Sequence, residues 1–163
     1  RSAGRDVVIV RGDQRLPTGL AALVLPGVLL DSGEHRALRL WVEAGGQLLW
    51  HGLDTMACGP GQAAVVGAVP ADAAVSRPAT VAIGDRTWSL AHWSRSYRPV
   101  LALRGARALH GDARGPLVVY NELGRGRCVG GAAHIEECVA AEDPAERARW
   151  AGWYQAMLAE LGV

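Results

Sequence analysis

Lysine and phenylalanine are absent from the 163-residue chain, and asparagine occurs once, as Asn121. All three residues have AT-rich codons, so their scarcity indicates a GC-rich, bacterial coding sequence rather than selection for function. The absence of lysine nevertheless excludes a P-loop lysine, a Schiff-base lysine and a Ser-x-x-Lys nucleophile pair.

Neither sign of charge is in excess, because 17 basic residues face 16 acidic ones and the formal net charge is +1. This balance gives no electrostatic reason to expect nucleic acid or an anionic membrane as a partner. The longest apolar run, from Gly19 to Leu30, is too short to span a bilayer and is interrupted by Pro26. No signal-peptide pattern is present, so we expect a soluble protein and favour the cytoplasm. Because the chain opens at Arg1 rather than methionine, we interpret it as a piece of a longer polypeptide.

Cysteine is scarce and irregularly spaced, at Cys58, Cys128 and Cys138. An odd number at such spacing does not form a disulfide framework, and no Cys-x-x-Cys is present. The glycine-rich segments Gly59-Pro60-Gly61 and Gly124-Arg125-Gly126 lack the further residues of a phosphate or dinucleotide cradle, so we interpret both as turns. We therefore expect neither a metal nor a cofactor.

The first third of the chain has the pattern of a βαβ unit. Asp31 and Glu34 have capping-box spacing for a helix that presents Leu38, Trp41 and Val42 and ends at Gly45-Gly46. Apolar runs before and after it predict strands at 6–10, 21–25 and 47–51. Strand, helix and strand joined by tight turns favour a parallel sheet with a right-handed crossover.

The remainder is richer in strands. A short helix is predicted around 62–66, followed by strands at 79–83, 87–90 and 98–103 and by a hairpin of 117–120 with 127–131. A final helix is predicted to start after Asp143 and to end at Gly162. No repeat or linker divides the chain, so residues 1–163 are expected to form one domain.

Five ordered elements together resemble the glutamine-amidotransferase-like domain that follows the catalytic barrel of β-galactosidases and related glycoside hydrolases, often called the trimerisation domain. They are DVVIV, LVLPGVLL, EHRALRLWVEAGG with QLLWHGLD, PLVVYNELGRGRCVGG, and ARWAGWYQAMLAELG. The resemblance covers most of the chain and is weakest between Asp54 and Arg95.

This resemblance implies an α/β fold, a flavodoxin-like three-layer αβα sandwich with a β-rich second half. The family's first βα unit has no counterpart in the pattern. The resemblance also implies a non-catalytic accessory domain, whose parent enzyme would be a glycoside hydrolase of the β-galactosidase or cellulase-like kind. Such a domain would pack on the catalytic domain of the same polypeptide or mediate homo-oligomerisation.

Amidotransferases of this class carry a cysteine at a tight turn after a strand, with a His-x-Glu pair that activates and orients it. The matching turn position in this chain falls at or near Gly52, which has no nucleophile. His134 and Glu136 resemble the remaining pair, although two such residues also occur together by chance. We therefore expect a degenerate site without catalytic residues.

Two alternatives remain open at this point. A diverged hydrolase would use Cys58 or another group with His134 and Glu136. A carbohydrate-binding module would use Trp88 and Trp93, although a packing role is the simpler interpretation of both tryptophans.

Overall fold

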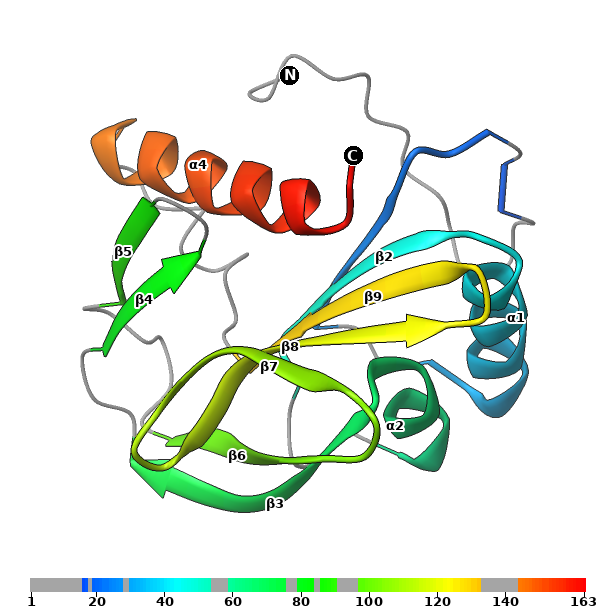
Figure 1. The fold of residues 1–163 in the computed structure, drawn as a ribbon, viewed down its shortest axis with the longest axis horizontal. Coiled ribbons are helices and arrows are strands. Elements are labelled where there is room, and N and C mark those ends of the chain that lie inside the picture. Colours follow the sequence, from blue (N-terminus) through cyan, green and yellow to red (C-terminus); the bar gives the residue numbers. More distant parts are fainter. Residues whose placement is uncertain are drawn as a thin grey trace.

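The computed structural model describes residues 16–17, 19–27, 30–53, 59–75, 79–83, 86–90, 97–132 and 144–163. These residues form a mixed α/β fold, in which helices cover both faces of a five-stranded mixed sheet (Figure 1). In chain order the elements are β1 (Leu23–Pro26), α1 (Ser32–Glu43), β2 (Gln47–His51), α2 (Pro60–Val66), β3 (Ala68–Val75), β4 (Ala79–Ile83), β5 (Arg86–Leu90), β6 (Tyr97–Leu103), β7 (Arg107–Asp112), β8 (Gly115–Leu123), β9 (Gly126–Gly131) and α4 (Pro144–Glu160).

The main sheet has the strand order β1-β2-β9-β8-β7. Strands β1, β2 and β9 are parallel, and the hairpin partners β8 and β7 continue the sheet in antiparallel fashion. Two smaller antiparallel pairs, β3 with β6 and β4 with β5, lie beside this sheet, where β6 contacts β8 and β4 contacts β7. The β1-α1-β2 unit is therefore the βαβ unit that the sequence predicts.

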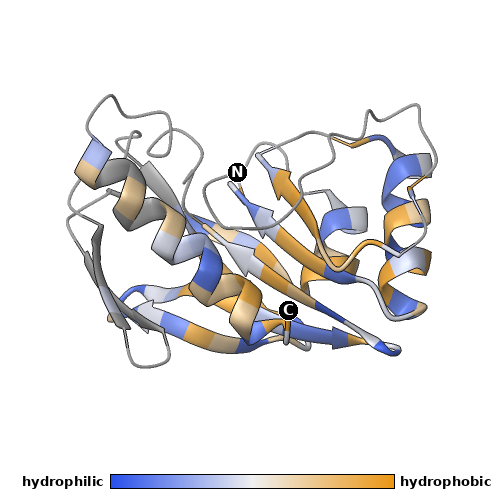
Figure 2. Cartoon of the chain, turned by 90° about the horizontal axis from the view of Figure 1, so that it is seen from above, coloured by the Kyte–Doolittle hydropathy of each residue, from blue (hydrophilic) through white to orange (hydrophobic). Residues whose placement is uncertain are grey.

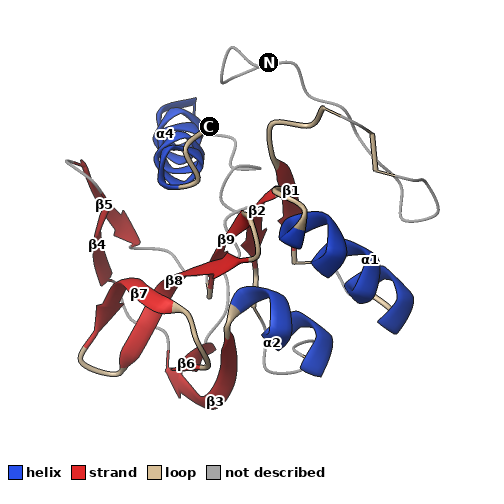
Figure 3. Ribbon diagram, turned by 45° about the vertical axis from the view of Figure 1, so that its right-hand side comes forward, coloured by secondary structure: helices blue, strands red, loops and turns tan. Residues whose placement is uncertain are grey.

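Alternate residues of the central strands face opposite layers, as the period of a strand requires. Leu48 and Trp50 of β2 pack against α1 and α2, whereas Leu49 packs against α4. All three are at most 1% exposed. Because both faces are covered, the central strands carry mostly hydrophobic residues (Figure 2), and α4 lies across the sheet from α1 and α2 (Figure 3).

Helix α1 begins with the predicted capping box. The Asp31 side chain accepts a hydrogen bond from the Glu34 backbone N–H at 2.8 Å, and the Glu34 carboxylate accepts one from the Asp31 N–H at 2.8 Å. These two bonds satisfy backbone donors that a helix start would otherwise expose. Leu38 and Val42, both predicted on the apolar face, are buried in the core.

The turn between β8 and β9 closes the other end of α1. The Arg125 backbone N–H donates to the carbonyl of Glu43 at 3.0 Å, and the Arg125 guanidinium donates to that of Ala44 at 3.0 Å. A Cβ placed on Gly126 would collide with the carbonyl oxygens of Val42 and Gly46. The glycines of this turn thus permit a close approach that satisfies the last carbonyls of the helix.

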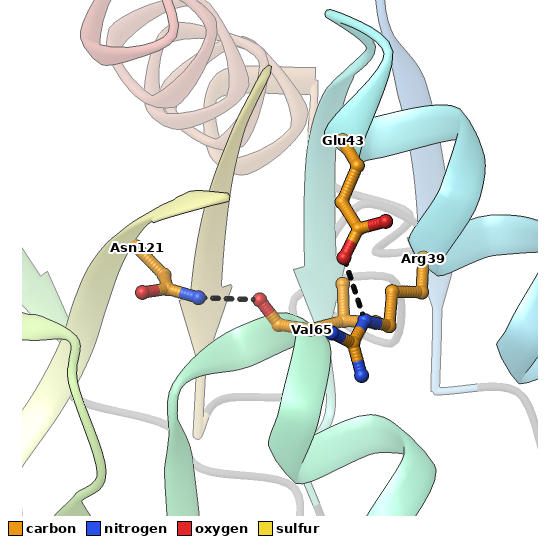
Figure 4. A network of polar contacts seen from close by, with 4 residues as sticks. All are labelled: Arg39, Glu43, Val65 and Asn121. Carbon is orange, nitrogen blue, oxygen red and sulfur yellow. Dashed lines mark hydrogen bonds and ion pairs between the residues drawn. The ribbon is translucent and has the colours of Figure 1, made fainter. Parts of the chain in front are cut away.

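The only asparagine has a structural role at the end of α2. Asn121 is 8% exposed, and its Nδ2 donates to the carbonyl oxygen of Val65 at 2.8 Å (Figure 4). A Cβ on Gly67, whose φ is +70°, would lie 2.7 Å from Cγ of Asn121. The hydrogen bond to Val65 and the close contact with Gly67 together join β8 to the turn that leads from α2 into β3.

Helix α4 covers the opposite face with Trp153 and Met157, and Leu161 directly after the helix belongs to the same layer; each of the three is 1% exposed. At the C-terminal end of this helix, the carbonyl oxygen of Leu161 accepts a hydrogen bond from the guanidinium of Arg127 in β9 at 3.3 Å. A cation near the C-terminus of a helix also complements the helix dipole. Gly162 follows with φ +78°, as the sequence predicts for a helix end.

The patterns miss strands β3 and β7 and place several strand ends one to three residues away from those observed. Strand β3 is rich in alanine, contains Pro70 and Asp72 with a register shift between them, and has little strand propensity of its own. Strand β7 contains Gly111 and two register shifts next to His110. The predicted strand 21–25 is β1, which includes Pro26; β1 has only β2 as a partner among the described strands, and proline is tolerated at such an edge. The predicted strand 6–10 and the capping Asp143 lie outside the described residues.

Candidate functional site

The carboxyl ends of three parallel strands meet at one edge of the main sheet. The register pairs Pro26 of β1 with His51 of β2, and Trp50 of β2 with Gly130 of β9. In open α/β sheets, ligands bind outside the carboxyl ends of the parallel strands. This edge is therefore where a site should be sought.

Gly52 occupies the bend immediately after β2. Its φ is +67°, in the left-handed region that favours glycine. The next residue, Leu53, is 1% exposed, and its N–H donates to the carbonyl of Gly131 at 3.1 Å, which ties the bend to β9. Because glycine has no side chain, this bend offers backbone atoms alone and no nucleophile.

The imidazole next to this bend points into the protein. His51 is 1% exposed, and its ring meets the Tyr154 ring of α4 edge-on, with centroids 4.9 Å apart and an interplanar angle of 86°. A Cβ on Gly131 would lie 3.5 Å from its Nδ1. His51 therefore belongs to the layer between the sheet and α4.

The other predicted site residues are not brought together by the described structure. His134, Glu136, Trp93 and Cys58 lie outside the described residues. Trp88 belongs to β5, where its backbone pairs with Val81 of β4. The hypotheses of a degenerate His-x-Glu pair and of a tryptophan-lined sugar site consequently stay predictions.

The one cysteine in the described part of the chain is Cys128 of β9, which is fully buried on the α1/α2 side of the sheet. Burial raises the pKa of the Cys128 thiol well above its usual range. Since the thiolate is the nucleophilic form, this side chain is unreactive at neutral pH.

Among the described residues, no group of three or more His, Cys, Asp or Glu side chains is arranged to hold a metal ion. No helix within the described ranges has the length and apolar character needed to cross a membrane.

One polar cluster near this edge has no counterpart among the predicted site residues. His35 of α1 stacks on Trp50 of β2, with ring centroids 5.8 Å apart and an interplanar angle of 26°. A Cβ on Gly61 of α2 would lie 2.7 Å from Cγ of His35, so the first turn of α2 packs directly on this imidazole. Gln62, the next residue, is 2% exposed. The one available signal was a glutamine at an inward position of α2, which is unusual for so polar a side chain.

No protein-family model and no curated protein matches this sequence. Solved structures do match. An exo-β-1,4-mannosidase from Opitutaceae bacterium strain TAV5 is similar with 33% identity and a TM-score of 0.78, over 91% of this chain and 27% of that one. A β-galactosidase from Rahnella sp. R3 is similar with 18% identity and a TM-score of 0.71, over 99% of this chain and 25% of that one.

The fold also occurs outside these enzymes. A cytoplasmic protein from Salmonella typhimurium LT2 matches with 13% identity and a TM-score of 0.61, over 86% of this chain and 71% of that one. The second and third similarities, at such low identity, concern the fold alone. This chain spans about a quarter of the length of the two glycoside hydrolases, so it corresponds to a small part of each.

Proposed function

We propose that this chain is a non-catalytic accessory domain of a glycoside hydrolase, of the glutamine-amidotransferase-like type. The observation that carries the proposal is the similarity to the mannosidase, which extends over 91% of this chain but only 27% of the enzyme. A glycosidase needs two carboxyl groups facing each other across the sugar, usually within a large catalytic domain. A segment that corresponds to about a quarter of such a protein is better suited to support than to catalysis.

The arrangement of layers supports the finer assignment of the fold. Residues 1–163 are proposed to form one flavodoxin-like αβα unit, built on the parallel strands β1, β2 and β9 with helices on both faces. The hairpin partners β8 and β7, together with the two smaller strand pairs, would be the β-rich second half that the resemblance implies.

Gly52 supports the absence of catalysis in this domain. Acyl transfer of the amidotransferase kind requires a nucleophile at the bend after the central strand, where the base can reach it. Here the bend is Gly52, which has a hydrogen in place of a side chain, and the thiol of Cys128 is buried between the sheet and helices α1 and α2. A His-x-Glu pair at 134 and 136 would then have nothing to activate.

The domain would act by packing on the catalytic domain of its own polypeptide or on a second copy of it. We propose that the parent enzyme hydrolyses β-linked hexosides, because the two hydrolases named above act on a β-1,4-mannoside and a β-galactoside according to their names. This substrate class can be tested directly.

The natural gene product provides that test. Its intact mass should exceed that of the 163-residue chain several-fold, and it should hydrolyse an aryl β-mannoside or aryl β-galactoside. Excision of residues 1–163 should lower its thermal stability or change its oligomeric state in size-exclusion chromatography with light scattering. A natural product consisting of these 163 residues alone would refute the accessory role.

A further inference from the structure

Three polar side chains, two of them buried and one half-buried, belong to the region where α1, α2 and β2 pack together. Trp50 is 1% exposed and Gln62 is 2% exposed, while His35 stacks on the Trp50 ring and contacts the first turn of α2 at Gly61. Gln62 shares the inward side of α2 with Val65 and Val66, both of which belong to the same core as Trp50.

One polar atom of each side chain has no hydrogen-bond partner among the described residues. These atoms are Nε2 of His35, Nε1 of Trp50 and Oε1 of Gln62. Most buried polar atoms in proteins are hydrogen-bonded, and an ordered water commonly completes the set where protein groups do not.

The tautomer of His35 follows from its other ring nitrogen. Nδ1 lies 2.8 Å from the carbonyl oxygen of Asp31, and a carbonyl oxygen can only accept. Nδ1 must therefore carry the proton, and in the neutral imidazole Nε2 is an acceptor. The unsatisfied set is thus one donor, the indole N–H of Trp50, and two acceptors, Nε2 of His35 and Oε1 of Gln62.

We propose that one buried water molecule binds at this junction. Its oxygen accepts from the indole N–H of Trp50, and its two protons go to Nε2 of His35 and Oε1 of Gln62. A water molecule matches this set of one donor and two acceptors, whereas a sugar hydroxyl has one proton and would leave an acceptor unsatisfied. The water joins both helices to β2 two residues before the bend at Gly52, and this inference does not depend on the proposed function.

Nuclear magnetic resonance of the ¹⁵N-labelled chain tests the proposal directly. The indole proton of Trp50, assigned by its loss in Trp50→Phe, should show cross-relaxation to a long-lived water. The nitrogen shifts of His35 should report a protonated Nδ1 and an unprotonated Nε2. An Nε2–H tautomer, or an indole proton without water contact, would overturn the proposal.

A pair of glutamine variants separates this water from general burial. Gln62→Met keeps the length of the side chain but removes one acceptor of the water molecule. The water is then held by two hydrogen bonds instead of three, so exchange of the Trp50 indole proton with solvent should accelerate about tenfold, as expected when the water loses one hydrogen bond. Gln155→Met on the exposed side of α4 is the matched control and should leave the rate unchanged. Equal rates in both variants would contradict the assignment. If Gln62→Met fails to fold, the proposal is decided on the unaltered chain by the cross-relaxation of the Trp50 indole proton to water and by the nitrogen shifts of His35. Displacement of the water signal by methyl β-mannoside would contradict the proposal and identify a sugar site instead.

Discussion

Gly126 should be among the least replaceable residues of the chain, although its backbone is not in the left-handed region. Alanine at this position would place Cβ against the carbonyl oxygens of Val42 and Gly46. Neither oxygen can move freely, because Val42 belongs to the last turn of α1 and Gly46 leads into β2. The turn between β8 and β9 would have to withdraw from the helix.

The magnitude follows from the contacts that this withdrawal would break. Arg125 donates to Glu43 and Ala44, each at 3.0 Å, and the Arg127 N–H donates to the Gly46 carbonyl at 3.2 Å. At about 1 kcal/mol for each hydrogen bond, with an overpacking cost of about 1–3 kcal/mol, Gly126→Ala should destabilise the fold by roughly 4–6 kcal/mol. For a chain of this size, that lowers the melting temperature by about 10 °C or more.

Gly59→Ala is the matched control, because a Cβ there meets nothing within 4 Å and the backbone φ is −76°. Urea titrations of both variants, followed by tryptophan fluorescence and circular dichroism, should show a large loss of unfolding free energy only for Gly126→Ala. A difference of less than about 1 kcal/mol between the two would refute the docking of this turn on α1.

Further variants test the buried polar groups and the surface. Asn121→Ala should cost about 1–3 kcal/mol in urea unfolding, because the carbonyl of Val65 loses its donor (Figure 4), and an unchanged midpoint would argue against this bond. The Cys128 thiol should resist a mild alkylating agent at neutral pH until the protein unfolds, and rapid labelling of the native protein at Cys128 would contradict its burial. Burial raises the pKa of the Cys128 thiol in the folded state. The stability contributed by the protonated thiol is therefore complete below the unfolded pKa of about 8.5 and declines as pH rises above that value. Cys128→Ala should consequently reduce the loss of unfolding free energy at alkaline pH. Arg39→Ala removes an ion pair with Glu43 at 2.8 Å, in which the two side chains are 52% and 31% exposed, and should change stability by less than about 0.5 kcal/mol. A larger loss would show that the pair matters more than its exposure suggests.

Local sequence signals were sufficient to predict those elements whose own residues mark where they begin and end. The capping box of Asp31 and Glu34 gave the start of α1, and the glycines after it gave the end. The run Gln47–His51 is β2 in full, because a strand buried on both faces is apolar almost throughout. The turn position at or near Gly52, by contrast, came from the family resemblance applied to the end of that strand.

Contacts between distant parts of the chain could not be predicted in this way. Asn121 and Val65 are 56 positions apart, and Arg125 and Ala44 are 81 positions apart. Nothing in either local sequence indicates its partner. Strand β3 was missed for the same reason, since its alanine-rich sequence becomes a strand only by pairing with β6. The polar junction of His35, Trp50 and Gln62 likewise comes from three separate elements.

The most direct test of the central claim is a turnover measurement on the purified 163-residue chain. Aryl β-mannoside, aryl β-galactoside and glutamine should each be hydrolysed no faster than in buffer, because the bend after β2 presents only Gly52 and the described thiol is buried. Hydrolysis of any of the three that is abolished by His134→Ala, in a variant that retains the native circular-dichroism spectrum, would contradict the account.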